Sequence, residues 1–155
     1  MICRFATARG TQGKRHLIMA PVGIHQLAPG PHGHQRSLKL SGRSITPDWI
    51  WREEAITRLL ASHKQGHLFV AGCKTNQGKF YSQFDHIALL SAPAQVLLAR
   101  ISVRDSNPYG KRPEERALIL QYLAEVEPRL RATATIEIDA AAPISRVVQQ
   151  LETLG

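Results

Sequence analysis

The sequence predicts a three-layer α/β fold over residues 47–155, in which a parallel sheet is covered by helices on both faces. Short apolar runs alternate with amphipathic segments, and the runs are apolar nearly throughout rather than at every second residue. Strands of that kind are buried on both faces, which is typical of a parallel sheet. The amphipathic segments begin with proline or acidic residues, which are favoured in the first turn of a helix.

The first predicted helix begins at Thr46-Pro47-Asp48 and ends before Gly66. Glu53 and Glu54 strengthen its positively polarised start. At helical spacing one face is apolar and comprises Trp51, Ala55, Ile56, Leu59 and Leu60. Three apolar runs then predict strands, which right-handed crossovers would join side by side. They are His67–Gly72, Asp85–Ser91 and Thr135–Asp139.

Three further helices are predicted to begin at Pro93, Pro113 and Pro143. Proline is favoured there because its missing N–H would have no partner within the helix. The first has the apolar set Val96, Leu97 and Ile101. The second has Ala117, Leu118, Leu120, Leu123 and Val126, and the third Val147, Val148, Leu151 and Leu154.

Length and composition bound the class of protein. The chain has 155 residues and a mass of 17.2 kDa, which fits one domain. Its two cysteines are too few for a disulfide framework, so we expect a reducing, cytoplasmic location. The longest stretch without acidic or basic residues, 16–35, is interrupted by three prolines, so no membrane span is predicted.

Charge and periodicity both change near residue 46. Residues 1–47 contain seven Lys and Arg residues and no Asp or Glu, whereas residues 48–155 contain thirteen and twelve. Proline and glycine interrupt every apolar run before residue 46. We therefore expect a basic, irregular N-terminal segment over residues 1–46 and an α/β domain over residues 47–155.

Three motifs in the second part carry a family resemblance. LFVAGCKTNQGKFYSQFD, RDSNPYGKRPEERALIL and ATIEIDAAAPISRVV occur in that order. Together with DWIWREEAI they make the segment from Asp48 to Gly155 resemble the C-terminal two-thirds of small P-loop ATP-binding kinase-like proteins, which are similar to shikimate and adenylate kinases. The resemblance implies a parallel sheet of P-loop kinase type. It also implies binding of ATP with Mg²⁺ and phosphoryl transfer to a small molecule or nucleotide.

The resemblance also implies roles for single residues. In such kinases a basic lid loop closes over the nucleotide, and here the matching cations are Arg104, Lys111, Arg112 and Arg116. A solvated basic loop paired with Glu114 and Glu115 is the alternative. Gly72-Cys73 would form a wall on the substrate side or simply a tight turn, with Cys73 a structural thiol. Ala142 and Pro143 would lie against the adenine.

The nearest match to a phosphate loop is ARGTQGKR, residues 8–15, in which Gly10, Gly13 and Lys14 would bind the nucleotide. Lys14, Arg104 and Arg112 are then the predicted catalytic residues. This reading requires a central strand over residues 2–7 and a helix after Lys14. Ala8 replaces the first glycine of the family pattern, and Arg15 stands where a Ser or Thr would hold Mg²⁺.

Residues 1–46 leave three explanations open: a divergent start, an added basic arm, or an out-of-frame or wrongly chosen start. Three functions compete as well. They are an active kinase acting on an unidentified small acceptor, a non-catalytic P-loop remnant, and a nucleic-acid-associated protein that uses the basic arm. Nucleic acid is the least favoured partner, because the arm has one aromatic residue for base stacking, Phe5. His16, His25, His32 and His34 indicate a solvated loop rather than a metal site.

Overall fold

The computed structural model describes the backbone of residues 2–5, 13–20, 33–36, 39–40, 43–44, 48–105 and 107–154. Side chains are described for residues 13–20, 50–105 and 107–154. Gly10, His25 and His32 lie outside these ranges. Within the described part of the chain, no helix has both the length and the apolar character that crossing a bilayer requires.

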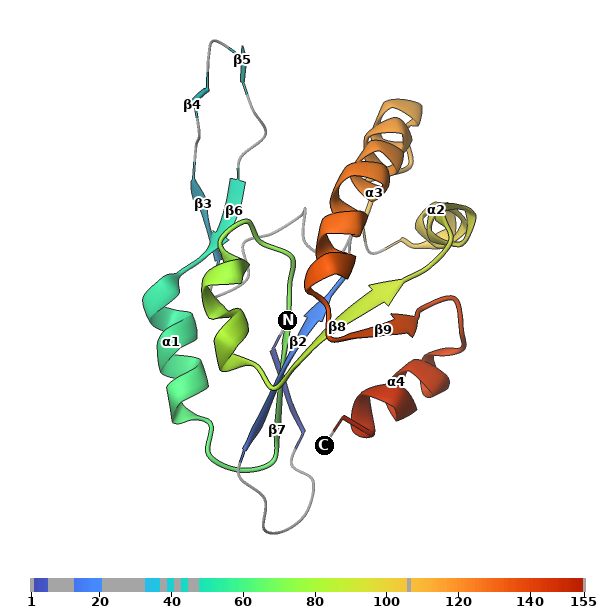
Figure 1. The fold of residues 1–155 in the computed structure, drawn as a ribbon. Coiled ribbons are helices and arrows are strands. Elements are labelled where there is room, and N and C mark those ends of the chain that lie inside the picture. Colours follow the sequence, from blue (N-terminus) through green and yellow to red (C-terminus); the bar gives the residue numbers. More distant parts are fainter. Residues whose placement is uncertain are drawn as a thin grey trace.

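Five of the described strands form a sheet of α/β type with the order β1-β7-β2-β8-β9 (Figure 1). Strands β7, β2, β8 and β9 are parallel, as the continuous apolar runs predicted, and β1 pairs antiparallel with β7 at one edge. Their bounds are Ile2–Phe5 for β1, Lys14–Met19 for β2, His67–Ala71 for β7, His86–Ser91 for β8 and Ile136–Asp139 for β9.

Two expectations about the first third of the chain are wrong. The strand at residues 2–5 is an edge strand, not the central one, and Lys14 begins strand β2 rather than preceding a helix. Strand β2 occupies the centre, and its apolar residues Leu17 and Met19 are fully buried there. The parallel sheet therefore takes its central strand from the segment predicted to be irregular, N-terminal to residue 47.

Residues 48–51 also differ from the prediction. They form strand β6 (Asp48–Trp51), which pairs with β3 (Gly33–Arg36), and helix α1 begins only at Glu53. Two aromatic residues, Trp49 and Trp51, favour extended structure there. A further pair joins β4 (Lys39–Leu40) to β5 (Arg43–Ser44).

The helices follow the predicted order, and the last three begin at or beside the predicted prolines. Pro93 and Pro143 immediately precede α2 and α4, and Pro113 is the first residue of α3. The bounds are Glu53–Ser62 for α1, Ala94–Val103 for α2, Pro113–Thr133 for α3 and Ile144–Glu152 for α4, with a 3₁₀ helix, η1, over Gln77–Gln83.

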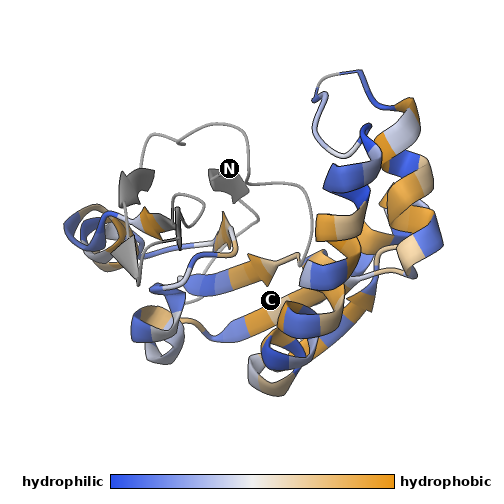
Figure 2. Ribbon diagram, turned by 90° about the horizontal axis from the view of Figure 1, so that it is seen from above, coloured by the Kyte–Doolittle hydropathy of each residue, from blue (hydrophilic) through white to orange (hydrophobic). Residues whose placement is uncertain are grey.

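The main core lies on one face of the sheet. There α1, η1 and the C-terminal half of α3 cover the central strands, and Trp51 joins them. The buried members are Leu17, Met19, Trp51, Ile56, Leu60, Leu68, Val70, Phe80, Phe84, Ile87, Leu89 and Leu130. Figure 2 shows long hydrophobic stretches on the strands, beside helices that alternate hydrophobic and hydrophilic residues.

The opposite face of β8 and β9 packs against α4. Val147 is buried against Ala88 and Ile138, and Leu151 and Leu154 are half-buried around them. Val148, predicted to belong to this apolar set, is 42% exposed.

Helix α3 buries only part of the apolar set that was predicted. Ile119 and Leu130 are buried, and Leu123 and Val126 are half-buried. The predicted members Ala117, Leu118 and Leu120 are exposed instead. Apolar residues at 117–120 surround the helix, so spacing alone did not identify the buried side.

Arg15 acts as a cap for helix α1 from the neighbouring strand. Its Nε donates to the carbonyl of Leu60 at 3.0 Å and its Nη2 to that of His63 at 3.4 Å. The last turn of α1 contains no basic residue of its own, and a cation there satisfies carbonyls and the negative end of the helix dipole. The position predicted to disrupt a Mg²⁺ site is thus a structural contact between β2 and α1.

Candidate functional site

The sheet topology indicates where a ligand would bind. From β2 the chain crosses to β7 on one side, whereas from β8 it continues to β9 on the other. Between β2 and β8 the connections therefore diverge, and in open parallel sheets ligands bind outside the carboxyl ends of the strands at such a point. The carboxyl edge here is formed by Met19, Ala71 and Ser91.

Helix α3 brings the predicted lid loop to the same edge. Its 21 residues make it roughly 31 Å long at 1.5 Å per residue. Thr135, just after α3, donates its N–H to the carbonyl of Ile87 near the start of β8. The start of α3 must therefore project past the carboxyl ends of the shorter strands, as Figure 1 shows.

The loop joining α2 to α3 is held by its own polar groups. The Nη2 of Arg104 donates to the carbonyl of Tyr109 at 2.9 Å, and the Nε of Arg116 donates to that of Gly110 at 3.2 Å. The Gly110 N–H donates to Glu115 Oε2 at 2.8 Å, and this bond lowers the pKa of Glu115. Two of the four predicted lid cations thus fix the loop on α2 and α3.

The other two cations, Lys111 and Arg112, are exposed, as Arg116 is, but among the described residues no bond from their side chains to a loop carbonyl is seen. Lys111 forms a long ion pair with Asp105, at 3.5 Å, and Asp105 is itself fully exposed. The backbone N–H of Arg112, at the cap of α3, donates to Glu115 Oε2 at 3.3 Å. An exposed ion pair contributes little to stability, and the Arg112 bond uses its backbone, so both side chains are accessible to an anion at the carboxyl edge.

Gly13 and Lys14 lie at the opposite end of the sheet. Their N–H groups donate to the carbonyls of Lys64 and Gly66, both at 2.9 Å, in the connection that leads into β7. A six-residue strand spans roughly 17 Å, so β2 separates Lys14 from the carboxyl edge. The structure therefore does not bring Gly13 and Lys14 together with the lid-loop residues.

Ala142 and Pro143, predicted to lie against the adenine, follow β9 at the carboxyl edge. The neighbouring backbone is held by an arginine that the sequence did not single out. Arg100 on α2 donates from Nη1 to the carbonyl of Ala140 and from Nη2 to that of Ala141, the latter at 3.3 Å. This contact fixes the β9–α4 loop against α2.

Gly72 and Cys73 follow β7 and lie against protein rather than open space. A Cβ on Gly72 would approach the Trp51 indole to 3.3 Å, so the missing side chain admits that ring. Burial raises the pKa of the half-buried Cys73 thiol, which disfavours the reactive thiolate. Both observations favour packing roles.

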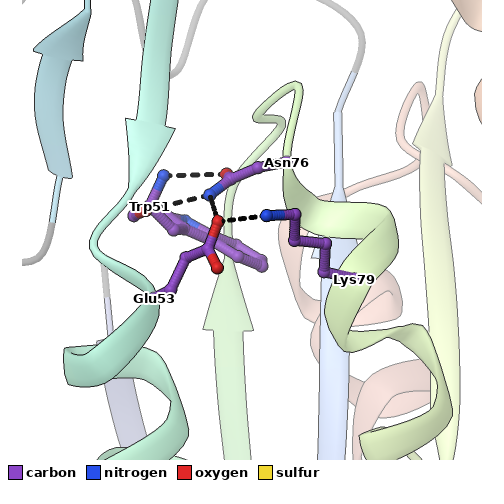
Figure 3. Close-up of polar contacts among 4 residues, drawn as sticks. All are labelled: Trp51, Glu53, Asn76 and Lys79. Carbon is purple, nitrogen blue, oxygen red and sulfur yellow. Dashed lines mark hydrogen bonds and ion pairs between the residues drawn. The ribbon is translucent and has the colours of Figure 1, made fainter.

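A polar cluster beside this edge joins the start of α1 to η1 (Figure 3). Asn76 Oδ1 accepts from the Trp51 N–H, and Asn76 Nδ2 donates to the Trp51 carbonyl, both at 2.9 Å. Glu53 Oε1 accepts from Asn76 Nδ2 at 3.5 Å and from Lys79 Nζ at 2.6 Å. The Lys79 hydrogen bond is the main cause of the lowered Glu53 pKa. Sequence reasoning missed these contacts, since no motif links residues 51–53 to residues 76–79.

Gln77 supports the end of the central strand from within the core. It is 4% exposed, and its Nε2 donates to Met19 Sδ at 3.2 Å and to Tyr81 Oη at 2.8 Å. Its Oε1 accepts from the Lys74 N–H at 2.9 Å. The loop after β7 is thereby fixed to the last residue of β2.

The described residues do not provide a metal centre. Among them, no group of three or more His, Cys, Asp or Glu side chains converges at metal-binding distance. Two acidic side chains near the carboxyl edge are already used, Glu53 by Lys79 and Asp139 by the N–H of Ala141. Each of these two carboxylates would have to share its oxygens with its present partner in order to hold Mg²⁺.

Comparison with protein families, curated proteins and solved structures finds no match in any of the three. The arrangement of strands and polar side chains therefore stands as the basis for a functional proposal.

Proposed function

We propose that this protein binds a nucleotide at the carboxyl edge of its parallel sheet and transfers a phosphoryl group from ATP to a small acceptor, in the manner of the small kinases that it resembles. The observation that carries the proposal is the divergence of the chain between β2 and β8. A cytoplasmic location, where ATP and Mg²⁺ are available, belongs to the proposal.

Lys111 and Arg112 supply the charge in this proposal. Both are exposed at the end of α3 that projects past the strands. Guanidinium groups pair with phosphate oxygens through two parallel hydrogen bonds, and an ammonium adds a compact positive charge. Mg²⁺ would arrive bound to the ATP phosphates, which is how this ion usually enters kinase sites.

A second candidate is nucleotide binding without catalysis. The position of Lys14 at the amino end of β2 favours it, since the lysine predicted to contact the transferred phosphate is remote from the edge. Both candidates predict binding at the carboxyl edge and differ only in turnover.

If the protein binds Mg-ATP at this edge, the ligand should raise its unfolding temperature. The rise should persist at about 0.3 M salt, which screens surface charge. Ligand bound only to the folded state stabilises it by about 2.7 kcal/mol at 100 times its Kd. A K111Q/R112Q double variant should weaken ATP binding about tenfold or more, because it removes two exposed cations. K14Q, at the other end of β2, and K64Q, on the exposed α1–β7 connection, serve as matched controls and should bind as the parent does.

Equal weakening by K14Q would place the phosphates at the amino end and overturn the proposed location. A stabilisation that disappears at raised salt would indicate only attraction to basic groups, and equally salt-sensitive binding of duplex DNA would favour the nucleic-acid alternative. Where salt-resistant binding is found, release of ADP with a panel of small acceptors separates the kinase from the non-catalytic candidate.

A further inference from the structure

Three histidines from neighbouring strands lie side by side at the amino end of the sheet. His16 on β2 is fully buried, and its Nε2 lies 3.0 Å from Nδ1 of His67 on β7. The ring of His86 on β8 is parallel to the His16 ring, with centroids 5.5 Å apart. Phe69 stacks on His16 at 4.7 Å. None of these groups belongs to the carboxyl edge.

The contact between His16 and His67 limits how many protons the pair can carry. A hydrogen bond between two ring nitrogens needs one N–H donor and one bare acceptor. Two imidazolium rings would turn two N–H groups toward each other at 3.0 Å and lose the bond. The pair can therefore keep this bond with one extra proton, carried on the outer nitrogen of the donor ring, but not with two.

The surroundings of His16 oppose a charge on its ring. Burial is the main cause that lowers the pKa of His16 to about 4, and His67, His86 and Lys14 contribute in the same direction. Asp85, just before β8, acts the other way. Its carboxylate already accepts the Arg15 N–H at 2.7 Å. On α4, which covers the adjoining part of this face, the charged residues Arg146 and Glu152 are exposed.

We propose that His16, His67 and His86 form a proton-sensitive cluster that loosens the amino ends of β2 and β7, and with them the edge strand β1, in mildly acidic solution. The geometry determines where the loosening occurs. Residues Lys14–Ile18 of β2 pair with His67–Ala71, and β1 is held to the sheet only through β7 among the described strands. A second proton would break the His16–His67 bond and so weaken the pairing of β2 with β7.

Whether stability rises or falls with pH depends on which state, folded or opened, binds more protons. The folded pKa of His16, about 4, lies below its ordinary value of 6.5, so between these values the opened state binds more protons. The contribution of neutral His16 to folding is fully present above pH 6.5. It falls as pH drops through that window and is fully lost below about 4. At pH 5 the opening equilibrium should be roughly 30-fold more favourable than at pH 8.

Amide hydrogen exchange, corrected for the intrinsic effect of pH, tests this proposal. We expect protection of the β1, β2 and β7 amides to fall roughly 10- to 30-fold between pH 7.5 and pH 5, with a smaller change in α4. A H16F variant keeps an aromatic ring against Phe69 and should lose most of this dependence. His63 is also buried but bonds to the Gly66 carbonyl outside the cluster, so H63Q is the matched control and should keep it.

NMR titration of the histidine rings in the parent protein gives a second readout that requires no variant to fold. A His16 ring that stays neutral down to about pH 5 agrees with the proposal. The proposal is overturned if His16 titrates near 6.5. It is also overturned if protection of β1, β2 and β7 is unchanged at pH 5, or if H63Q removes the dependence as fully as H16F does.

Discussion

A G110A variant is expected to lose about 3 kcal/mol of unfolding free energy. Gly110 has φ +89°, where an L side chain is strained. A Cβ there would also lie 2.7 Å from Ile101 Cγ2 and 2.8 Å from Ile119 Cδ1. Both isoleucines are buried, at 4% and 2% exposed, so neither can turn aside into solvent. Chemical unfolding monitored by circular dichroism measures the loss.

Gly78 in η1 is the matched control, because a Cβ built there meets no atom within 4 Å. G78A should change the free energy of unfolding by less than about 0.5 kcal/mol. If G110A is as stable as G78A, the loop between α2 and α3 does not pack as described. The placement of Lys111 and Arg112 at the carboxyl edge, which depends on that loop, would then be wrong as well.

A W51A variant should lose about 4 kcal/mol, within the range for removing a large aromatic side chain from a core. Trp51 is 5% exposed, packs edge-to-face on Phe80 at 5.8 Å and fills the space that Gly72 leaves. W51F keeps an aromatic ring and the backbone bonds to Asn76, so it should lose about half as much. Denaturant midpoints for the three proteins provide the comparison.

Equal stability of W51A and the parent would show that Trp51 is not part of the core. The sequence predicted Trp51 on the apolar face of a helix, and the structure places it at the end of β6 instead. The Trp51 ring can fill the core from a helix or from a strand. The backbone bonds from Trp51 to Asn76 form only with the extended backbone of β6.

The α/β order after residue 66 was predictable from the sequence, because apolar runs and prolines mark each boundary there. Strand β7 begins at the predicted His67, and α3 begins at Pro113. The buried side of α3 was not predictable, because Leu118, Ile119 and Leu120 are consecutive and only packing selects Ile119. The local pattern predicted the element correctly where a continuous apolar run or a proline marked the boundary.

Strand β2 could not be recognised locally, since it begins with Lys14, Arg15 and His16. Two of these polar residues, Arg15 and His16, are accommodated by distant partners. Arg15 caps α1 and His16 bonds to His67, which is 51 residues away. Burial of such groups is tolerated only when their partners are in place, and spacing within residues 14–19 contains no sign of those partners.

The candidate site was predictable in part. The sequence identified the basic loop, but it did not separate Arg104 and Arg116, which bond to loop carbonyls, from exposed Lys111 and Arg112. The local pattern GxxGK predicted Lys14 to be a phosphate contact. Sheet order decides that position, and sheet order depends on contacts far apart in the chain.

Chemical-shift mapping with Mg-ATP tests the proposed binding edge most directly. We expect saturable shifts of the Gly72, Ser91 and Gly110 amides and of the residues around them, at salt that screens surface charge. The amides of Gly13 and Lys14 should not move. Saturable shifts confined to residues 13–15 and 63–66 would place the nucleotide at the amino edge and contradict the account. An absence of any saturable shift would contradict nucleotide binding itself.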